Sequence, residues 1–472
     1  MESPNFEVQR RIRRVLIANR GEIAIRILRA CRALEIEVIA AVSEADKDSL
    51  VARLADGVAV IGPAPATQSY LRADLLISAA TNHACDAVHP GYGFLSERST
   101  FAQQCTDAGL IFIGPSPQTI KAIGDKITAG ELATKAGVPR LPGSNAVPDA
   151  KEARHTANEI GYPVLLKAAA GGGGRGMRVV RSESDIEAAF ESASKEAQAS
   201  FNDRTLYVEK FIENSRHIEI QVIGDQHGNV IHLGERECST QRRHQKLIEE
   251  APSPALSEHI RSRMSECAVQ LAKSVGYFSA GTVEFLMDTR DGSFYFLEMN
   301  TRIQVEHPVT EMVTGIDLLI EQIRVACGLP LVFNQADIRL NGHAIECRIN
   351  AEDPDRNFLP RAGVVTEWHP PSGDGIRVDS HCFSGMEISP YYDSLLAKVV
   401  VHAPTREEAI ALMDRTLLSL KVTGPATTAP FHRSVLKHSD FKHGRVTTRW
   451  VEDVFLPQRK QTLNAANAEP SA

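Results

Sequence analysis

The sequence of 472 residues lacks the features that mark several protein classes. Its eight cysteines are scattered and form no CxxC pair, which argues against a disulfide framework and a zinc site. No apolar run approaches the roughly 20 residues that span a bilayer. The N-terminus, MESPNFEVQRRIRR, lacks the apolar stretch of a secretory signal. We therefore expect a cytoplasmic protein with no membrane partner.

The chain also has no excess of basic residues and no internal repeat. Its formal net charge of -7 argues against a nucleic-acid partner, because a basic field supplies most of the non-specific affinity for phosphate backbones. The content of 43% hydrophobic and 24% charged residues is ordinary for a globular protein, and the length suggests about three domains.

The first hundred residues alternate short apolar runs with helical patterns. Residues 15–18 read as a buried strand, and the turn NRGE leads into a helical pattern over 22–34. Further apolar runs follow at 38–42, 86–89 and 110–113. This order predicts a parallel sheet with helices on its faces, as in a Rossmann-like domain. The first turn lacks the G-x-G-x-x-G fingerprint, so we do not expect NAD there.

A glycine-rich stretch, GGGGRG at 171–176, separates two predicted strands at 163–167 and 177–180. No helix follows the glycines and no GK[ST] ending is present, which disfavours a Walker-type phosphate loop. Four consecutive glycines favour a mobile flap whose backbone N–H groups fold over phosphates. A flexible hairpin tip is the other interpretation.

Residues 294–306, FYFLEMNTRIQVE, carry the strongest polar pattern. If they are extended, period-2 alternation sends the even-numbered side chains to one face. The aromatic start predicts that this face emerges from a core, so its polar row indicates a site. An amphipathic strand with a solvated face is the alternative. After Phe294 and Phe296, the row consists of Glu298, Asn300, Arg302, Gln304 and Glu306.

The run 281–287 and the turn DTRDGS predict an antiparallel hairpin with this strand. If Met287 faces Tyr295, then Glu284 faces Glu298. Like charges directly opposite each other are destabilising unless something positive lies between them. A divalent cation held by carboxylate oxygens, with Asn300 adding a neutral oxygen, is the simplest solution.

Four other places in the sequence contain groups suited to binding a nucleotide. Lys126 and Lys167 are candidates for phosphate contacts, LYVEKFIE at 206–213 has the character of an adenine hinge, and QRRHQK at 241–246 is a basic cluster suited to an anion. Taken singly, a lysine is more often a solvated surface residue and the run 206–213 is more often an ordinary strand. For the basic cluster the alternative is a solvated face, but in an acidic chain an anion is favoured.

The rest of the chain is predicted to contain two further helices and a third domain. They are one helix carrying Ile120, Ile123, Ile127 and Leu132, a helix from Gly315 to Cys327, and a third domain over about 342–450 with one helix near Glu407 to Leu420. The hydrophilic segment after about Arg459 predicts a disordered tail.

Long motifs occur in order along the chain: NRGEIA at 19–24, HPGYGFLSE at 89–97, GGGGRGM at 171–177, RHIEIQV at 216–222, CSTQRRHQK at 238–246, EMNTRIQVEHPVTE at 298–311, ECRINAEDP at 346–354 and PYYDS at 390–394. Together they resemble the biotin carboxylases of the ATP-grasp superfamily over residues 12 to 453. Ala170 followed by four glycines stands where many relatives have five. The run 422–432 is less distinctive, and no function is assigned to it.

The resemblance implies an α/β and α+β architecture with an ATP-grasp fold. It places a Rossmann-like (pre-ATP-grasp) domain at 12–125, an ATP-grasp domain at 126–330 with a glycine-rich lid at about 139–214, and a mixed α+β C-terminal domain at 331–457. A disordered tail is expected at 458–472.

The resemblance also implies that ATP phosphorylates bicarbonate to carboxyphosphate, whose carboxyl group then passes to N1′ of biotin. The cofactors would be ATP, Mg2+ or Mn2+, and biotin. Residues that match the family's ATP contacts are Lys126, Lys167, Gly173, Gly174, Glu209, Lys210, Phe211, Ile212, His217, Gln241 and His244.

Other matched positions would hold the metal and bicarbonate. The metal ligands would be Glu284, Glu298 and Asn300, and bicarbonate would meet Lys246, Arg302, Gln304 and the backbone of Val305. The catalytic set would be Lys246, Arg302, Glu306 and Arg348. Glu306 would be the general base, provided that its pKa lies near the working pH, and Arg348 would stabilise the biotin enolate. Cys238 is expected to be structural, because the reaction requires no thiol.

The expected assembly has several subunits. The chain has no Met-Lys-Met biotinyl site and no length left for a carboxyltransferase. Biotin is therefore expected on a separate biotin carboxyl carrier protein, with carboxyltransferase subunits completing an acetyl-CoA carboxylase. A two-subunit pyruvate or other acyl-CoA carboxylase is the alternative, and the resemblance implies a homodimer. Rival functions are a carboxylate-amine ligase and a nucleotide sensor that binds ATP without turnover.

Overall fold

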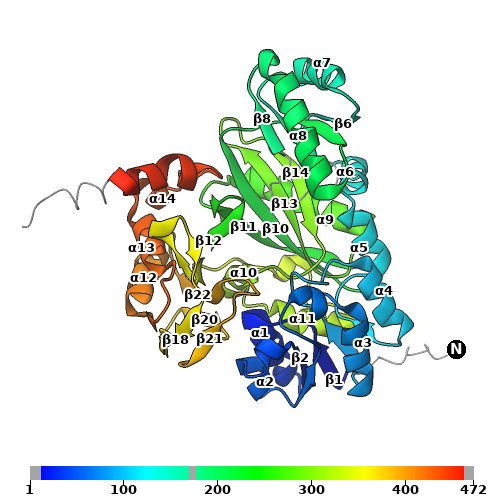
Figure 1. The fold of residues 1–472 in the computed structure, drawn as a ribbon, viewed down its shortest axis with the longest axis vertical. Coiled ribbons are helices and arrows are strands. Elements are labelled where there is room, and N and C mark those ends of the chain that lie inside the picture. The colour runs from blue at the N-terminus through cyan, green and yellow to red at the C-terminus, as the bar shows by residue number, and fades with distance from the viewer. Residues whose placement is uncertain (1–11, 169–176, 462–472) are drawn as a thin grey trace, which may run out of the picture.

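The computed structural model describes residues 12–168 and 177–461, and its ribbon shows an N-terminal part, a C-terminal part and a smaller part formed by the middle of the chain (Figure 1). The N-terminal part and the C-terminal part lie side by side at the base. A small lid formed by the middle of the chain stands above them. No helix among the described ranges is long and apolar enough to cross a membrane.

The N-terminal part is a five-stranded parallel sheet in the order β3-β2-β1-β4-β5, which confirms the predicted parallel sheet. Its central strand is buried because helices cover both faces of a parallel sheet. The elements are β1 (Arg14–Ile17), α1 (Gly21–Ala33), β2 (Glu37–Val42), α2 (Leu50–Leu54), β3 (Gly57–Val60), α3 (Ala73–Asn82), β4 (Ala87–His89), α4 (Ser99–Asp107), β5 (Ile111–Phe112) and α5 (Pro117–Gly124).

The single helix predicted after β5 was wrong, because the structure has two helices there. Asp125 is extended between α5 and α6 (Lys126–Lys135), and its side chain accepts a hydrogen bond from the backbone N–H of Thr128 at 2.8 Å. Aspartate is a strong N-cap residue, so it starts a new helix although the apolar periodicity continues across the break.

The lid contains a four-stranded sheet in the order β6-β9-β7-β8. β7 and β8 pair antiparallel, which confirms the two strands predicted on either side of the glycine-rich stretch. The predicted phosphate-covering flap, with Gly173 and Gly174, lies outside the described residues. The lid elements are β6 (Gly143–Val147), α7 (Ala150–Ile160), β7 (Val164–Ala168), β8 (Met177–Val180), α8 (Ile186–Phe201) and β9 (Leu206–Lys210).

An eight-stranded sheet in the order β14-β13-β10-β11-β12-β15-β22-β20 forms the centre of the molecule. It crosses into the C-terminal part where β12 pairs antiparallel with β15, so the backbone hydrogen bonding is continuous across the domain boundary expected at residues 330–331. The elements up to that boundary are β10 (Ser215–Gly224), β11 (Val230–Arg242), β12 (Gln245–Ala251), α9 (Glu258–Ser274), β13 (Ser279–Asp288), β14 (Phe294–Asn300), α10 (His307–Thr314) and α11 (Leu318–Ala326).

The two faces of this sheet differ sharply on β10. Ile218, Ile220 and Val222 pack into the apolar core that includes α9, whereas the alternating positions His217, Glu219 and Gln221 point to the opposite face. All six side chains are buried. Helix α10 packs beside β11, β12, β15 and β22 on the polar face, which therefore lines the functional site.

The C-terminal part contains more helix than the sequence predicted. The helix expected near 407–420 is α12 (Arg406–Ser419), but α13 (Ala429–Lys437) and α14 (Ser439–Lys442) follow it. The strands are β15 (His343–Asn350), β16 (Glu352–Asp353), β17 (Leu359–Pro360), β18 (Gly363–Val365), β19 (Glu367–His369), β20 (Ile376–Ser380), β21 (Met386–Ile388), β22 (Leu395–Ala403) and β23 (Lys421–Thr423).

The expected disorder from residue 458 was wrong for its first residues. Residues 456–461 are helical, and Arg459 forms an ion pair of 2.5 Å with Asp355. Residues 462–472 lie outside the described ranges.

The helix expected from Gly315 to Cys327 is shorter, because Gly315 takes a left-handed conformation (φ 74°) that ends α10 before α11 begins.

Candidate active site

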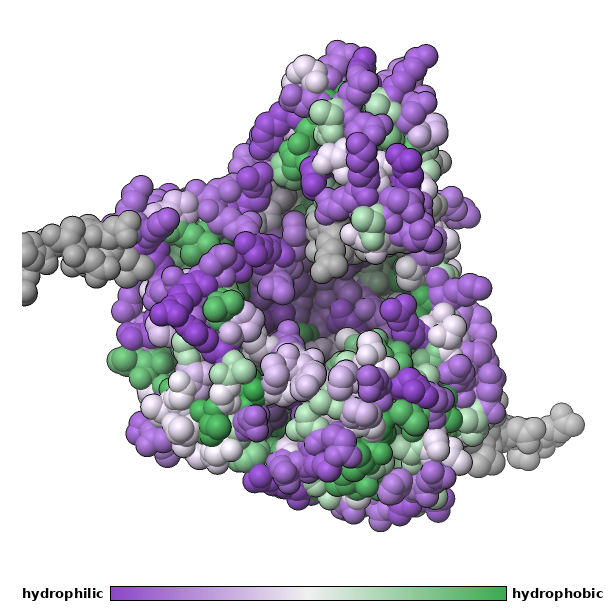
Figure 2. All heavy atoms as spheres, viewed as in Figure 1, coloured by the Kyte–Doolittle hydropathy of each residue, from purple (hydrophilic) through white to green (hydrophobic). Residues whose placement is uncertain are grey.

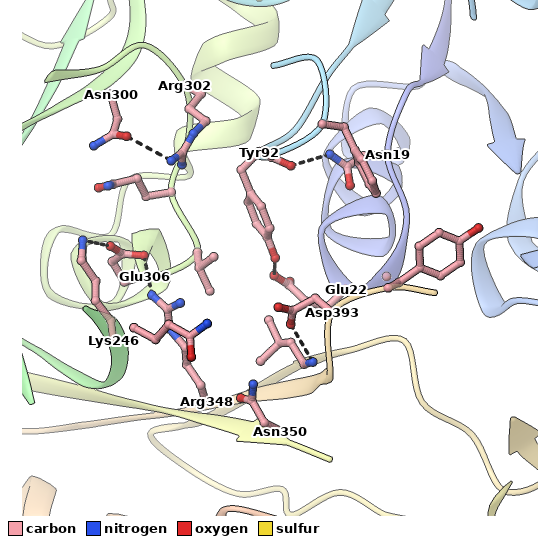
Figure 3. Close-up of a pocket in the computed structure, with 18 of the residues that line it drawn as sticks. Asn19, Glu22, Tyr92, Lys246, Asn300, Arg302, Glu306, Arg348, Asn350 and Asp393 are labelled. Carbon is pink, nitrogen blue, oxygen red and sulfur yellow. Dashed lines mark hydrogen bonds and ion pairs between the residues drawn. The ribbon is translucent and has the colours of Figure 1, made fainter. Parts of the chain in front are cut away.

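A cavity of about 680 Å³ opens between the polar face of the large sheet and the N-terminal part. Figure 2 shows a hollow lined by hydrophilic side chains at the centre of the molecule, and Figure 3 shows the groups on its walls. Eleven of the predicted site residues line it: His217, His244, Lys246, Glu284, Glu298, Asn300, Arg302, Gln304, Val305, Glu306 and Arg348.

Glu284 and Glu298 are directly opposite each other on β13 and β14, as predicted. The predicted register at the hairpin end was wrong, because Met287 pairs with Phe294 and not with Tyr295. A bulge at Leu297 shifts the register by one and restores the pairing of the two glutamates. It also turns Phe296 to the core face opposite Glu298, so the aromatic start and the polar row do not share a face.

Protein groups occupy both oxygens of the Glu284 carboxylate. His217 Nε2 lies 2.7 Å from Oε2, while Lys246 Nζ (3.1 Å), Asn300 Nδ2 (2.9 Å) and Gln304 Nε2 (2.7 Å) reach Oε1. Although burial raises the pKa of Glu284, Lys246 and His217 hold it well below its usual range. Glu284 is therefore a firmly ionised carboxylate.

The pKa of Glu298 is shifted in the opposite direction from that of Glu284. Desolvation in the cleft and the negative charge of Glu284 raise the pKa of Glu298. Two facing carboxylates, one of which is destabilised by the other, form a donor set that a divalent cation would stabilise. The Asn300 amide oxygen, which accepts from Arg302 Nη2 at 3.0 Å, lies on the same strand two residues further along.

The chain bends after Asn300, so the alternation predicted for 298–306 holds only from Glu298 to Asn300. Residues 301–305 are irregular, and Glu306 is the N-cap residue of α10. The bent segment still brings its polar groups into the cleft. Arg302 donates to Glu97 at 2.9 Å, and Gln304 accepts from Arg236 at 2.9 Å while donating to Glu284.

Glu306 lies between two cations on the cleft floor (Figure 3). Lys246 Nζ is 2.5 Å from its Oε1 and Arg348 Nη2 is 2.9 Å from its Oε2. Burial raises the pKa of Glu306, but Lys246, Arg348 and Arg236 together lower it far below the ordinary value. The condition set for a general base, a pKa near the working pH, is therefore not met by Glu306 while these three cations lower its pKa.

Lys246 and Arg348 are themselves fixed by other carboxylates. Lys246 contacts Glu219 at 2.6 Å as well as Glu284 and Glu306, and these charges raise its pKa well above the usual range despite burial. Arg348 Nε donates to Glu249 at 2.6 Å.

The backbone of Arg348 is held by α13. Thr428 Oγ1 and His432 Nε2 lie 2.8 and 2.6 Å from its carbonyl oxygen. Both residues belong to the run 422–432, to which the sequence assigned no function.

The other predicted nucleotide contacts lie outside the cavity wall. Lys167 on β7 contacts Glu209 on β9, and Lys210 Nζ donates to the carbonyl of Gly161 at 2.8 Å. Phe211 and Ile212 follow β9, Lys126 begins α6, and Gln241 on β11 pairs with Lys246 on β12.

Several residues that shape the site were missed by the sequence analysis. The fully buried Arg236 donates to Glu219, Gln221, Thr282, Gln304 and Thr310, and so ties three strands to the bent segment and to α10. A signal was available for two of its partners, Glu219 and Gln221, because the polar residues of RHIEIQV at 216–222 alternate with apolar ones.

A second missed group links the N-terminal and C-terminal parts to the bent segment. Lys398 Nζ donates to the carbonyl of Val305 at 2.8 Å and lies 3.1 Å from Glu22, whose carboxylate also accepts from Tyr92. Lys398 is fully buried within the apolar strand LLAKVVV, and this isolated charge was the signal.

Comparisons with known proteins cover nearly the whole chain. Family models match at residues 11–120 (biotin carboxylase, N-terminal domain), 125–333 (carbamoyl-phosphate synthase L chain, ATP binding domain) and 346–453 (biotin carboxylase C-terminal domain). Biotin carboxylase 1 of Bacillus subtilis is 52% identical over 442 residues, which cover 93% of this chain and 98% of that protein.

Solved structures agree with this match. The biotin carboxylase of Campylobacter jejuni, described as a complex with β,γ-ATP, has 50% identity and a TM-score of 0.90, covering 93% of this chain and 98% of that one. The biotin carboxylase domain dimer of Hydrogenobacter thermophilus 2-oxoglutarate carboxylase has 48% identity and a TM-score of 0.89, covering 94% and 97%. The chain belongs to the biotin carboxylase family, with its ATP-grasp fold and ATP-dependent ligase activity.

Proposed function

We propose that the cleft carboxylates biotin with bicarbonate at the expense of MgATP, through carboxyphosphate. The observation that carries this proposal is the position of Glu306, a buried carboxylate held between Lys246 and Arg348. The pair Glu284 and Glu298 stands at one end of the same cleft. A metal-binding carboxylate pair beside a carboxylate with two cations suits a reaction that first phosphorylates and then transfers a small anion.

The nucleotide would lie between the lid and the large sheet. Glu284, Glu298 and Asn300 would hold Mg2+ or Mn2+, which neutralises phosphate charge when bound. Lys126, Lys167, His217 and His244 would contact phosphates, and residues 209–212 with Gln241 would surround the adenosine. The Hydrogenobacter structure is described with MgADP and bicarbonate, which supports this division of the cleft.

Bicarbonate would be held by Arg302, Gln304, Lys246 and the backbone of Val305. Gln304 has a fixed amide orientation, since Arg236 donates to its oxygen and its nitrogen donates to Glu284. Glu306 would accept the bicarbonate proton. A bound anion competes for the cations around Glu306 and raises its pKa, because nearby negative charge disfavours the carboxylate form.

Arg348 would stabilise the enolate oxygen of biotin once N1′ loses its proton. Its guanidinium presents two N–H donors in a plane, a geometry that suits a planar oxyanion better than a lysine does. Glu249 and Glu306 hold this plane from two sides. The same cation would therefore serve the proton acceptor and the second substrate.

The assembly is proposed from the relatives. Biotin would arrive on a separate biotin carboxyl carrier protein, and carboxyltransferase subunits would complete an acetyl-CoA carboxylase in the cytoplasm. The 2-oxoglutarate carboxylase relative supports the alternative, a carboxylase for another acceptor. That structure is described as a dimer, which supports a homodimer here.

ADP release measured with and without bicarbonate and free biotin tests the activity. We expect ADP formation to require bicarbonate and to rise when free biotin is added. ADP formation that depends on an amino acid and ignores bicarbonate would instead support the carboxylate-amine ligase. Nucleotide binding without ADP release would support the sensor.

A further inference from the structure

Two buried glutamates lie beside Arg348 in the large sheet. Glu249 on β12 and Glu346 on β15 are register partners, so their side chains project from the same face. Neither side chain has any measurable exposure (0% relative area for both residues). Opposite residues of an antiparallel pair have Cβ atoms about 4.5–5.5 Å apart, which brings two glutamates within hydrogen-bonding reach.

The hydrogen bonds of this pair are incomplete. Glu249 Oε1 accepts from Arg348 at 2.6 Å, but among the described residues no donor reaches Glu249 Oε2 or either oxygen of Glu346. Buried polar atoms without partners are costly, so three such oxygens on adjacent strands require an explanation. A proton on one carboxyl group would supply a donor to the other.

The cations near Glu346 already have other partners. Lys398 is the register partner of Arg348, and its Nζ is bound to the Val305 carbonyl and to Glu22. Arg348 is shared between Glu249 and Glu306. A second ionised carboxylate opposite Glu249 would therefore be an unpaired buried charge, which proteins avoid by neutralising the group.

The electrostatic environment agrees with this geometry. Burial raises the pKa of Glu346 well above its usual range, and Lys398 does not offset this effect because Glu249 and Glu306 add negative charge. The pKa of Glu249 rises only to about 7, because Arg348 stabilises its ionised form against burial. Of the two glutamates, Glu346 is the one that keeps a proton.

We propose that Glu346 is a neutral carboxylic acid whose O–H group donates to Glu249 Oε2. Glu249 then accepts from Glu346 on one oxygen and from Arg348 on the other, so its carboxylate plane is fixed. Glu346 is in this sense a positioning residue for Arg348, and its effect on turnover rests on the role proposed above for that arginine. The proposal predicts that steps involving biotin depend on Glu346 more strongly than bicarbonate-dependent ADP release does.

Two substitutions separate this role from simple packing. Glu346→Gln keeps a donor of the same shape, whereas Glu346→Leu fills the space without a donor. We expect Glu346→Gln to retain biotin-dependent turnover within about threefold and Glu346→Leu to lose about tenfold, as for one lost hydrogen bond to a charged group. Both variants should keep bicarbonate-dependent ADP release without biotin.

Either of two kinetic results would overturn the proposal. Normal biotin-dependent turnover in Glu346→Leu would show that the donor is dispensable, and an equal loss in Glu346→Gln would show that an ionised carboxylate is needed. Absence of bicarbonate-dependent ADP release in the wild-type chain would instead contradict the proposed function and leave the protonation of Glu346 to a direct measurement.

Infrared difference spectroscopy at neutral pH supplies that measurement without catalysis. The C=O stretching band of a protonated carboxyl group should be present in the wild-type protein and lost in Glu346→Gln. Glu250→Gln is the matched control, since Glu250 is the next residue on β12 and is buried, but lies against His343 and Arg406 in its ionised form. If Glu346→Gln loses no such band, the proposal is wrong.

Discussion

Arg348 Nη2 lies 2.9 Å from Glu306 Oε2, which joins the proposed base for bicarbonate to the proposed stabiliser of biotin. Because the two groups form one ion pair, a change in the charge of one side chain alters the pKa of the other. Phosphorylation of bicarbonate and carboxylation of biotin are then coupled through a single contact on the cleft floor.

Replacement of Glu306 tests the first half of this pair. Glu306→Gln removes the proton acceptor and keeps the volume, so bicarbonate-dependent ADP release should fall by at least ~10²-fold, as is typical for loss of a general base. Nucleotide binding, measured by calorimetry, should persist because Glu306 does not belong to the proposed metal set. Near-normal turnover would rule out Glu306 as the base.

Arg348 should affect the biotin step selectively. We expect Arg348→Ala to lower biotin carboxylation more than it lowers ADP release without biotin, because the enolate forms only when biotin reacts. Arg348→Lys keeps the charge but loses the planar pair of donors, so it should recover only part of the activity. Equal losses in both assays would assign Arg348 to the ATP half-reaction.

The contact between α13 and the Arg348 backbone predicts a smaller effect of the same kind. His432→Leu leaves the Arg348 carbonyl with Thr428 as its one remaining side-chain donor among the described residues, at a cost of about 1 kcal/mol for the lost hydrogen bond. Biotin-dependent turnover should fall roughly fivefold. Turnover should fall less in His432→Gln, whose side chain can still donate a hydrogen bond. Equal losses in the two variants would show that His432 acts only through packing.

We expect Glu250 to make a contribution to the free energy of unfolding that depends on pH. Although burial opposes ionisation, His343 and Arg406 lower the pKa of Glu250 to about 2. A carboxylate whose pKa is lowered in the folded state stabilises the fold above the unfolded pKa of about 4.3, and this contribution disappears as the pH falls toward 2. The difference amounts to about 3 kcal/mol.

The measurement is the free energy of unfolding of the wild type and of Glu250→Gln between pH 7 and pH 3. The two proteins should differ most at neutral pH and converge at acid pH. A constant difference across this range would contradict the assigned ion pairs.

The facing carboxylates of the proposed metal site could be predicted because they depend on local strand pairing. The prediction that Glu284 lies opposite Glu298 follows from the length of the two strands and the turn. It is correct only because an error in the predicted register is cancelled by a bulge that the sequence did not predict. The predicted register was off by one at Met287, and the bulge at Leu297 corrected it. A bulge is invisible to period-2 reasoning, which assumes uninterrupted pairing.

The bicarbonate end could not be derived from alternation, because β14 ends at Asn300. Residues 302–306 converge through Arg236 and Lys398, which come from β11 and β22, and no local pattern connects those strands to the bend. The resemblance to a known family supplied these residues where the strand argument stopped. The pairing of Glu346 with Glu249 could not be predicted because it depends on the register of β12 and β15, which brings together segments about a hundred residues apart.

The central claim is that this cleft moves carbon from bicarbonate to biotin at the expense of ATP. The direct test is to incubate the protein with ATP, magnesium, labelled bicarbonate and free biotin, and to measure both ADP and acid-labile label on biotin. The account predicts labelled biotin that requires ATP and magnesium and that disappears in Arg348→Ala. ADP formation with no label on biotin, in the presence of every component, would contradict it.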